Sequence, residues 1–403
     1  MEDIVRNEYI ERLWVLRNQN LIKVVTGVRR SGKSTIMLQF QKRLLDENPA
    51  AIVFSINFDV PEYRFLAEKS WKEVYDYVEK SLKPNVKNYV FLDEVQNVAE
   101  FEKLLEGLFV NPQVDLYVTG SNAYLLSSEL ATLLTGRAFE INVLPFSFAE
   151  YVAFTSKKDN LQKSYSDYVQ SGGFPEAIRL SQAGIVYSNQ YVQGVFQNIY
   201  QNDIQKRHKI YNEEAYLRVV NFLIDCVGSS VSATNIANVL SANGNKTTNK
   251  SISSYITTLV EAYIFYKANR YDIKGKQHLS TLEKYYMVDL GLRNALLGKE
   301  LSTDRGHLLE NVVYLELIRR NNQVWVGKID NLEVDFVVRT PKGYTQYIQV
   351  AQTLQSPETL ARELNPFNKI ADHHEKMIIS MDYENGSFNG VKQVNVIDWL
   401  MGK

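Results

Sequence analysis

One short segment near the amino terminus limits what this chain can fold into. Residues 27–34 read Gly-Val-Arg-Arg-Ser-Gly-Lys-Ser and satisfy the pattern G-x-x-x-x-G-K-[ST] at every fixed position. The apolar run Leu21–Thr26 precedes this segment, and apolar residues at helical spacing follow it as far as Leu45. Glycines in such a loop let backbone N–H groups turn inward around phosphate oxygens, and the following helix presents its positive end to the anion. The segment therefore predicts a phosphate-binding loop between a strand and a helix.

The loop also predicts ATP, or its product ADP, and Mg²⁺ as ligands. We expect Lys33 to neutralise the β and γ oxygens of the nucleotide, and the Ser34 hydroxyl to be a ligand of Mg²⁺. For Arg29 and Arg30, contact with phosphate and contact with a partner remain alternatives. The residues expected to bind the nucleotide are Gly27, Arg29, Arg30, Ser31, Gly32, Lys33, Ser34 and Thr35.

Two consecutive acidic residues support the same chemistry. The apolar run Tyr89–Leu92 leads directly into Asp93 and Glu94. We expect Asp93 to hold Mg²⁺, directly or through water, and Glu94 to orient and polarise the attacking water. An exposed loop with two acidic residues is the alternative interpretation.

Asn122 and Arg137 are further candidates for catalytic residues. Asn122 follows the expected strand Val114–Thr119, where its amide would contact the γ-phosphate or the attacking water. A helix N-cap or a turn is the alternative role for this asparagine. Arg137 is a candidate to stabilise the transition-state charge on the γ-phosphate of a neighbouring subunit. A surface salt bridge is the competing interpretation for the arginine.

Strands and helices alternate through the first part of the chain. Segments with helical spacing of apolar residues separate four expected strands, at residues 21–26, 51–58, 89–92 and 114–119. This alternation predicts an α/β domain over residues 1–150, with a parallel sheet covered by helices on both faces. Ligands of such sheets bind at the carboxyl ends of the strands, where the glycine-rich loop and the acidic pair fall.

The rest of the chain changes character twice. Over residues 151–300 a mostly helical stretch leads into three helices, a strand and a return strand, near 215–227, 232–240, 249–262, 265–271 and 283–288. Three helices followed by a hairpin are typical of a winged helix. Residues 301–403 begin with an expected helix over 306–320 and continue with short strands, which predicts a separate α/β or α+β domain.

Six motifs occur in sequence order, and together they resemble a known family. They read TGVRRSGKS at 26–34, FLDEVQ at 91–96, TGSN at 119–122, LTGR at 134–137, PFSFAEY at 145–151 and GGFPEA at 172–177. The combination resembles the predicted AAA+-type P-loop ATPases of bacteria and archaea, in which a C-terminal domain of unknown function follows the ATPase domain. The resemblance implies that Asn122 is a sensor residue and Arg137 a finger candidate. It also implies a winged helix and then a restriction-endonuclease-like fold in the C-terminal half.

A nuclease of that fold needs carboxylates around a divalent metal and a lysine near the scissile phosphate. Here Glu310, on an expected helix, and Asp335, on an expected strand, are the candidates for such a second metal site. The third element reads Gln349-Val-Ala, so Gln349 replaces a carboxylate and Ala351 replaces the lysine. Because one electrostatic contact of this kind is worth about 2.7–4 kcal/mol in a transition state, we predict a retained fold without efficient cleavage.

The composition limits the class of partner and the compartment. The 403 residues carry a net charge of −1, so no global basic field attracts nucleic acid or an anionic membrane, although a local basic patch stays open. The single cysteine, Cys226, excludes a disulfide or a cysteine zinc site within one chain. No apolar run approaches the roughly 20 residues that span a bilayer. We therefore expect a cytoplasmic protein without a membrane partner.

The residues together predict an enzyme, a Mg²⁺-dependent ATPase whose hydrolysis drives a conformational or assembly change. DNA is a candidate partner through the polar helix expected near 247–255 and through Lys274 and Lys276, with protein interaction as the alternative. The alternative function is an ATP-gated switch with little turnover that holds a protein or nucleic-acid partner. An active DNA nuclease is disfavoured by Ala351. Arg137 acting in trans would require a homo-oligomer.

Overall fold

The computed structural model describes residues 4–123, 136–242, 247–298 and 305–403. The chain divides into two units. The N-terminal unit consists of Glu2–Val143 with Glu261–Tyr263, and the C-terminal unit consists of Leu144–Val260 with Ile264–Lys403. The expected division into residues 1–150, 151–300 and 301–403 stays a prediction, and its second boundary lies outside the described residues.

A five-stranded parallel sheet forms the centre of the N-terminal unit, in the order β2-β3-β4-β1-β5. Nearly every residue of the inner strands is buried, as expected for parallel strands with helices on both faces. The strands are β1 (Ile22–Thr26), β2 (Ile52–Asn57), β3 (Asn88–Asp93), β4 (Val114–Thr119) and β5 (Ala138–Asn142).

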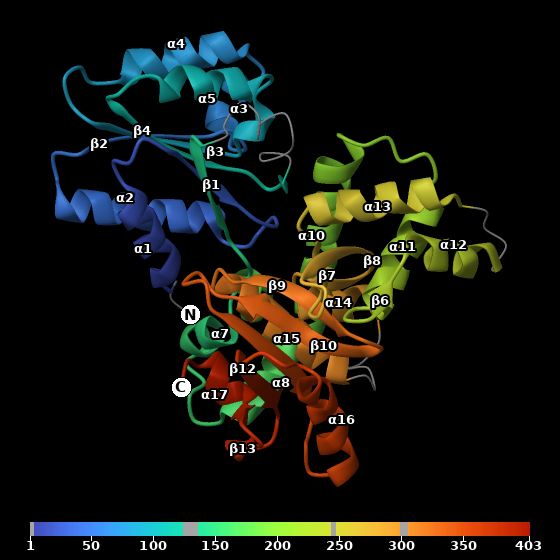
Figure 1. Cartoon of the computed structure of the whole chain (residues 1–403). Coiled ribbons are helices and arrows are strands. Elements are labelled where there is room, and N and C mark those ends of the chain that lie inside the picture. Colours follow the sequence, from blue (N-terminus) through green and yellow to red (C-terminus); the bar gives the residue numbers. More distant parts are fainter. Residues whose placement is uncertain (1–3, 124–135, 243–246, 299–304) are drawn as a thin grey trace. The chain divides into compact units, whose positions relative to one another are not determined.

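Helices cover both faces of this sheet (Figure 1). Val74 and Leu104, from two helices that follow each other in sequence, belong to the hydrophobic core on one face. Leu13 and Phe40 belong to the core on the other face. The α/β architecture expected for this part of the chain is confirmed. Its helices are α1 (Asn7–Leu16), α2 (Lys33–Glu47), α3 (Pro61–Ala67), α4 (Trp71–Ser81) and α5 (Phe101–Phe109), with a 3₁₀ turn at Val95–Asn97.

The two edge strands of this sheet differ from the expectation. The segment 51–58 was expected to be a buried strand, but in β2 only Ile56 is buried, because an edge strand has a neighbour on one side alone. The fifth strand, β5, is absent from the expected set. Its sequence leaves Phe139 exposed and carries Glu140, so it shows no continuous apolar run.

The C-terminal unit begins with a series of helices. Side-chain caps define several helix starts: Ser147 forms a capping box with Glu150, and Asn212 and Asp289 cap later helices. None of the described helices combines the length and the apolar character needed to cross a bilayer. The helices are α7 (Phe148–Thr155), α8 (Leu161–Ser171), α9 (Pro175–Ser181), α10 (Ile185–Ile199) continued by a π-helix (Tyr200–Gln205), α11 (Glu213–Asp225), α12 (Ala233–Ala242), α13 (Asn249–Glu261) and α14 (Leu290–Leu297).

A nine-stranded mixed sheet forms the rest of this unit, in the order β13-β14-β12-β11-β10-β9-β7-β8-β6. The helices α15 (Arg305–Arg319), α16 (Pro357–Asn368) and α17 (Val396–Leu400) accompany it. The strands are β6 (Ser230–Val231), β7 (Phe265–Asp272), β8 (Gln277–Met287), β9 (Gln323–Ile329), β10 (Leu332–Arg339), β11 (Thr345–Ala351), β12 (Glu375–Ser380), β13 (Gly386–Phe388) and β14 (Val391–Asn395).

The hairpin expected to end a winged helix belongs to this same sheet. Strand β7 pairs antiparallel with β8 and parallel with β9, where Arg270 lies opposite Val326. The pairing joins the expected second and third domains through one continuous set of backbone hydrogen bonds. An α/β region with a mixed sheet is therefore present, whereas the winged helix and the restriction-endonuclease-like fold stay predictions.

Candidate functional site

The backbone of the glycine-rich loop depends on two glycines. Gly27 directly follows β1 and has φ 132°, and Gly32 directly precedes α2 and has φ 98°. Residues that carry a Cβ atom rarely adopt these backbone angles. A Cβ atom at Gly27 would also lie 2.2 Å from the carbonyl oxygen of Val143. The loop after β1 therefore requires glycine at this position on steric grounds as well.

Three polar side chains line or support this loop. The Lys33 Nζ donates to the carbonyl oxygens of Gly27 (2.9 Å) and Val28 (3.1 Å), so the ammonium group points back into the loop. The Ser31 hydroxyl is buried and has no hydrogen-bond partner among the described residues. Such an orphaned group fits a phosphate oxygen that would satisfy it. Arg6, which precedes α1, donates from Nη1 to the Ser31 carbonyl oxygen (3.0 Å) and was missed because no motif includes it.

Asp93 joins this loop to the end of β3. The Ser34 hydroxyl is hydrogen-bonded to its carboxylate, Asn57 donates to Oδ2 (2.8 Å), and Thr119 donates to Oδ1. Burial raises the pKa of Asp93 above its usual value, and the charge of Glu94 adds to this shift, whereas the hydrogen bond from Thr119 opposes it. The Ser34 hydroxyl and the Asp93 carboxylate are oxygen ligands of the kind that Mg²⁺ prefers.

Glu94 lies beside Asp93 and is only 8 % exposed, which does not match the alternative of an exposed acidic loop. Its backbone has φ 56°, and its N–H donates to the Thr119 hydroxyl (2.9 Å). The Gln96 amide donates to its carboxylate and lies 3.4 Å from the Ser121 hydroxyl. The hydroxyl of Thr119 thus fixes both acidic residues. The sequence carried a signal for it, since Thr119 ends the strand next to Asp93.

Asn122 lies at the same edge of the sheet. It follows β4, which is hydrogen-bonded to β1 on one side and to β3 on the other, and it is 1 % exposed. The carboxyl ends of β1, β3 and β4 therefore bring together the loop, the acidic pair and this asparagine. The roles assigned to these residues stay predictions.

Arg137 lies at the opposite end of the sheet. Its carbonyl oxygen accepts from the N–H of Ile22 (2.7 Å), the first residue of β1, whereas the loop follows the last residue of that strand. Its guanidinium lies 3.8 Å from Glu106 and is about half exposed. The structure therefore does not bring Arg137 to the loop of its own chain. The preceding Leu134 and Thr135 of the LTGR motif lie outside the described residues.

The other residues expected to bind the nucleotide lie at the edge of the glycine-rich loop. Arg29 pairs with Asp59 at 3.5 Å, Arg30 is exposed with φ 65°, and the Thr35 side chain is exposed. These positions leave the two alternatives for the arginines open. At the other candidate site, Lys274 pairs with Asp330 at 2.6 Å, so this lysine is already engaged by an anion.

The second metal site was expected at Glu310 and Asp335. Both side chains are buried within the C-terminal unit, and protein groups contact both. Glu310 accepts from the Lys284 ammonium (2.9 Å), while Asp335 accepts from the N–H of Val350 (2.7 Å). Gln349 accepts from the N–H of Asp335 (2.7 Å). Sequence reasoning missed Lys284, although a lysine within the otherwise apolar end of β8 was a signal.

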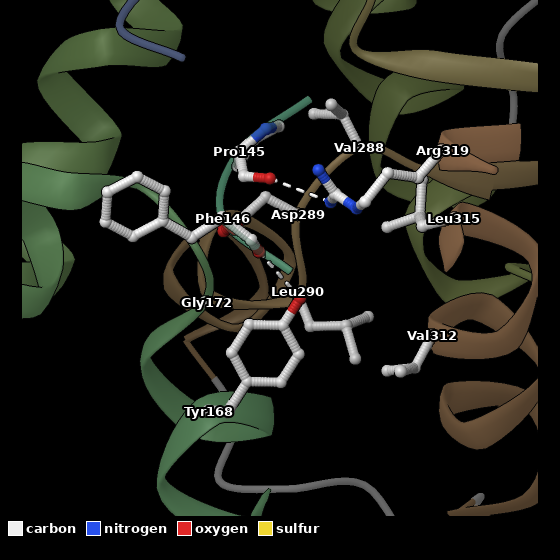
Figure 2. Close-up of a pocket in the computed structure, with 10 residues that line it drawn as sticks. All are labelled: Pro145, Phe146, Tyr168, Gly172, Val288, Asp289, Leu290, Val312, Leu315 and Arg319. Atoms are coloured by element: carbon white, nitrogen blue, oxygen red, sulfur yellow. Dashed lines mark hydrogen bonds between the residues drawn. The ribbon is translucent and has the colours of Figure 1, made fainter. Parts of the chain in front are cut away.

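The PFSFAEY and GGFPEA motifs meet at a small cavity in the C-terminal unit (Figure 2). Phe146 donates its N–H to Gly173 O (2.8 Å), and Tyr168 donates its hydroxyl to Phe146 O (3.0 Å). A Cβ atom at Gly173 would lie 2.4 Å from the carbonyl oxygen of Phe146. Asp289 accepts from the N–H of Gly173 (2.6 Å). These motifs therefore fix the backbone where the chain enters this unit.

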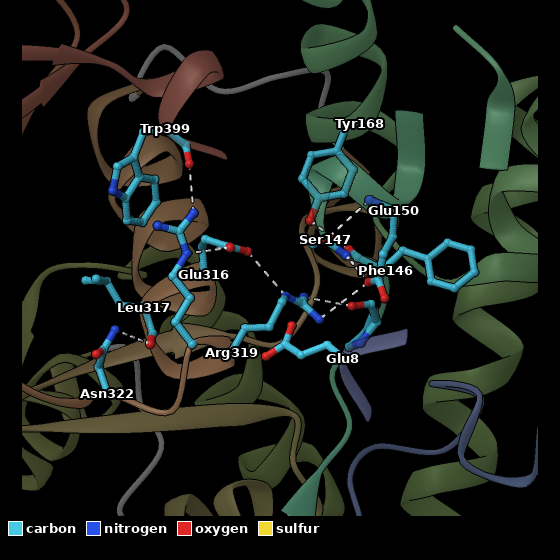
Figure 3. Close-up of polar contacts among 12 residues, drawn as sticks. Glu8, Phe146, Ser147, Glu150, Tyr168, Glu316, Leu317, Arg319, Asn322 and Trp399 are labelled. Carbon is cyan, nitrogen blue, oxygen red and sulfur yellow. Dashed lines mark hydrogen bonds and ion pairs between the residues drawn. The ribbon is translucent and has the colours of Figure 1, made fainter. Parts of the chain in front are cut away.

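Arg319 anchors the same region (Figure 3). Its Nη2 donates to the carbonyl oxygen of Pro145 (2.8 Å), its Nε lies 3.3 Å from Glu316, and its Nη1 lies 3.7 Å from Glu150. Because the side chain is buried, two carboxylates and a carbonyl oxygen compensate its charge. The first residue of the PFSFAEY motif is thus held by α15.

Comparison with known proteins agrees with this description. Residues 19–152 match a family described as an AAA domain, and residues 162–303 match a domain of unknown function (DUF8612). The Walker-type ATPase of Pyrococcus abyssi has a similar fold, with a TM-score of 0.50 and 15% identity over 73% of this chain and 96% of that chain.

Two relatives share much more of the sequence. An uncharacterized protein of Methanocaldococcus jannaschii is 31% identical over 79% of this chain and 72% of its own length. An uncharacterized protein of Haemophilus influenzae is 36% identical over 99% of this chain and 98% of its own length. From this identity and the AAA domain, the chain belongs to the family of the Haemophilus influenzae protein, a family of P-loop ATPase fold.

Proposed function

We propose that the protein binds ATP with Mg²⁺ and hydrolyses it, and that hydrolysis drives a conformational or assembly change. The observation that carries this proposal is that the glycine-rich loop, into which the Lys33 ammonium points, lies beside the Asp93 carboxylate, which interacts with the Ser34 side chain. This arrangement places the hydroxyl of the glycine-rich loop near the carboxylate at the end of β3. Such a pair is the expected holder of Mg²⁺ in P-loop ATPases.

Each neighbouring side chain has a task in this mechanism. The backbone N–H groups from Gly27 to Lys33 surround the phosphates, and the Lys33 ammonium exchanges its carbonyl partners for phosphate oxygens. Ser34 and Asp93 would hold Mg²⁺, which neutralises phosphate charge when bound. Glu94 accepts a hydrogen bond from the attacking water and polarises it. Asn122, at the same sheet edge, is the candidate to contact the γ-phosphate.

The first test is phosphate release from ATP with Mg²⁺, with and without DNA. We expect Lys33→Ala and Glu94→Gln each to reduce turnover by about 10²–10³-fold, as for loss of one electrostatic contact to a transition state. Lys42→Ala is a matched control, because Lys42 is exposed on the same helix. Turnover that survives both site variants at the wild-type rate would refute the assigned roles.

A second candidate function is an ATP-gated switch with little turnover. The observation that favours it is the hydrogen bond from Gln96 to the Glu94 carboxylate, which occupies the group that must polarise water. On this reading the wild type binds ATP tightly, binding is lost in Lys33→Ala, and Gln96→Ala raises turnover. Fast wild-type turnover that Gln96→Ala lowers would exclude the switch.

Two features of the chain bear on its partners. The position of Arg137, at the sheet end away from the loop of its own chain, supports action on a neighbouring copy. Exposed Thr248, Asn249 and Lys250 at the start of α13 support phosphate contact with DNA, which should weaken as salt rises. Action of Arg137 on a neighbouring copy requires a homo-oligomer. Sedimentation velocity of the protein with and without ATP measures whether one forms. An active DNA nuclease remains the least favoured function because Gln349 stands where a third carboxylate is expected.

A further inference from the structure

A buried lysine lies among three carboxyl groups in the C-terminal unit. The Lys284 side chain is 4 % exposed, and its Nζ lies 2.9 Å from Glu310 Oε1 and 2.7 Å from Glu333 Oε1. Asp335 follows Glu333 by two residues on β10, and its carboxyl group is near enough to Lys284 for the two to interact electrostatically. We call Lys284, Glu310, Glu333 and Asp335 the Lys284 cluster.

Three elements of the unit build this cluster. Helix α15 supplies Glu310, strand β8 supplies Lys284, and β10 supplies the other two carboxyl groups. The pairing of β10 with β9 shifts register between Val334 and Val337, so Asp335 lies in a bulge that re-aims its side chain. Strands β7 and β9 separate β8 from β10 in the sheet. The side chains of Lys284 and Glu333 extend toward each other across that separation and meet with Nζ and Oε1 2.7 Å apart.

Protein donors already bind the carboxyl oxygens. The Tyr286 hydroxyl donates to Glu310 Oε1 (2.5 Å), and the Arg270 guanidinium donates to Glu333 Oε2 (3.3 Å). The N–H of Val350 donates to Asp335 Oδ2 (2.7 Å). Mg²⁺ would need these oxygens at about 2.0–2.1 Å and would place two further positive charges beside a buried ammonium group. The donor set therefore does not fit a divalent metal while Lys284 is present.

We infer that Lys284 is the resident cation of this cluster and replaces the divalent metal that carboxyl groups in this arrangement would otherwise hold. The ammonium group compensates the buried carboxylates, which would repel one another without a cation. The C-terminal unit consequently holds no metal here, and the cluster becomes a divalent-cation site only when the lysine is removed.

Mn²⁺ alone is the probe for this inference, with bound and free ion separated by electron paramagnetic resonance of the nucleotide-free full chain. We expect Glu333→Gln to leave wild-type Mn²⁺ binding unchanged. Lys284→Ala should gain an equivalent of bound Mn²⁺, and the double variant Lys284→Ala/Glu333→Gln should lose it again. Lys267→Ala is the matched control, because it removes an ion pair with Glu283 on the same hairpin outside the cluster.

Two results would overturn the inference. The first is a wild-type Mn²⁺ site that Glu333→Gln removes, which decides the question even where Lys284→Ala fails to fold. The second is a folded Lys284→Ala variant, verified by circular dichroism, that gains no Mn²⁺. Neither measurement depends on ATP hydrolysis, so the proposed ATPase function can fail or hold separately.

Discussion

At the scale of single residues, the hydroxyl of Thr119 shows how the candidate site is organised. It donates to the Asp93 carboxylate and accepts from the N–H of Glu94, so one side chain orients two acidic residues with different expected tasks. The motif pattern located the loop and the acidic pair because spacing alone defines them. Contacts such as Arg6 with the Ser31 carbonyl depend on how distant segments meet, and spacing carries no information about them.

Asp289 makes a prediction about pH. Burial raises its pKa to about 6, against the hydrogen bonds from the N–H groups of Gly173 and Leu292. An acid with a raised folded pKa contributes stability that is fully present below its unfolded pKa, about 3.9, and is lost as pH rises through the folded value. This one group should lower the free energy of unfolding by about 2 kcal/mol between pH 4 and pH 7.

Urea unfolding of the wild type and of Asp289→Asn across this pH range provides the measurement. The variant loses one acceptor of the α14 cap and should be less stable than the wild type. The difference in stability between the two proteins should shrink as pH rises, because ionisation of the buried carboxyl group destabilises only the wild type. A deficit that grows with pH would mean that the folded pKa is lowered instead.

At the scale of elements, strands with continuous apolar runs could be predicted, including the edge strand β2, and strands without such a run could not. β1, β3 and β4 have helices on both faces, so burial dictates their composition directly. β5 and the short β13 alternate with polar or exposed residues, and pattern reasoning missed both. The pairing of β7 with β9 could not be predicted from the sequence either, because it joins segments that are far apart along the chain.

The pairing of β1 with β4 contains a buried ion pair whose loss should be costly. Lys23 and Asp115 are almost fully buried, and Asp115 also accepts from the Tyr117 hydroxyl (2.8 Å). Asp115→Asn leaves the Lys23 charge buried without its anion, so we expect the free energy of unfolding to fall by about 3–5 kcal/mol. Chemical denaturation measures this.

An exposed pair provides the comparison. Lys69 and Glu73 lie 3.7 Å apart and are both more than half exposed. Lys69→Met should change the free energy of unfolding by less than about 1 kcal/mol. Equal effects of the two substitutions would show that burial does not control the strength of the Lys23–Asp115 pair.

At the scale of the whole molecule, the division into two units predicts separate responses to nucleotide. The loop and the acidic pair belong to the N-terminal unit, while the Lys284 cluster belongs to the C-terminal unit. Calorimetry should resolve two transitions, and ATP with Mg²⁺ should raise only one of them. At a ligand concentration of 100 Kd the gain is about 2.7 kcal/mol. Lys33→Ala should abolish the shift, whereas equal displacement of both transitions would contradict independent units.

The close approach of Gly27 to Val143 has a mechanical consequence. The carbonyl of Val143 forms one wall of the phosphate loop, and the chain enters the next unit at Leu144. The next residue is Pro145, and its carbonyl oxygen accepts a hydrogen bond from Arg319. Proline locks its own φ and restricts the residue before it. Leu144 is the single residue between Val143, beside the phosphate loop, and Pro145, held by Arg319, so along the chain this connection has few free backbone torsions.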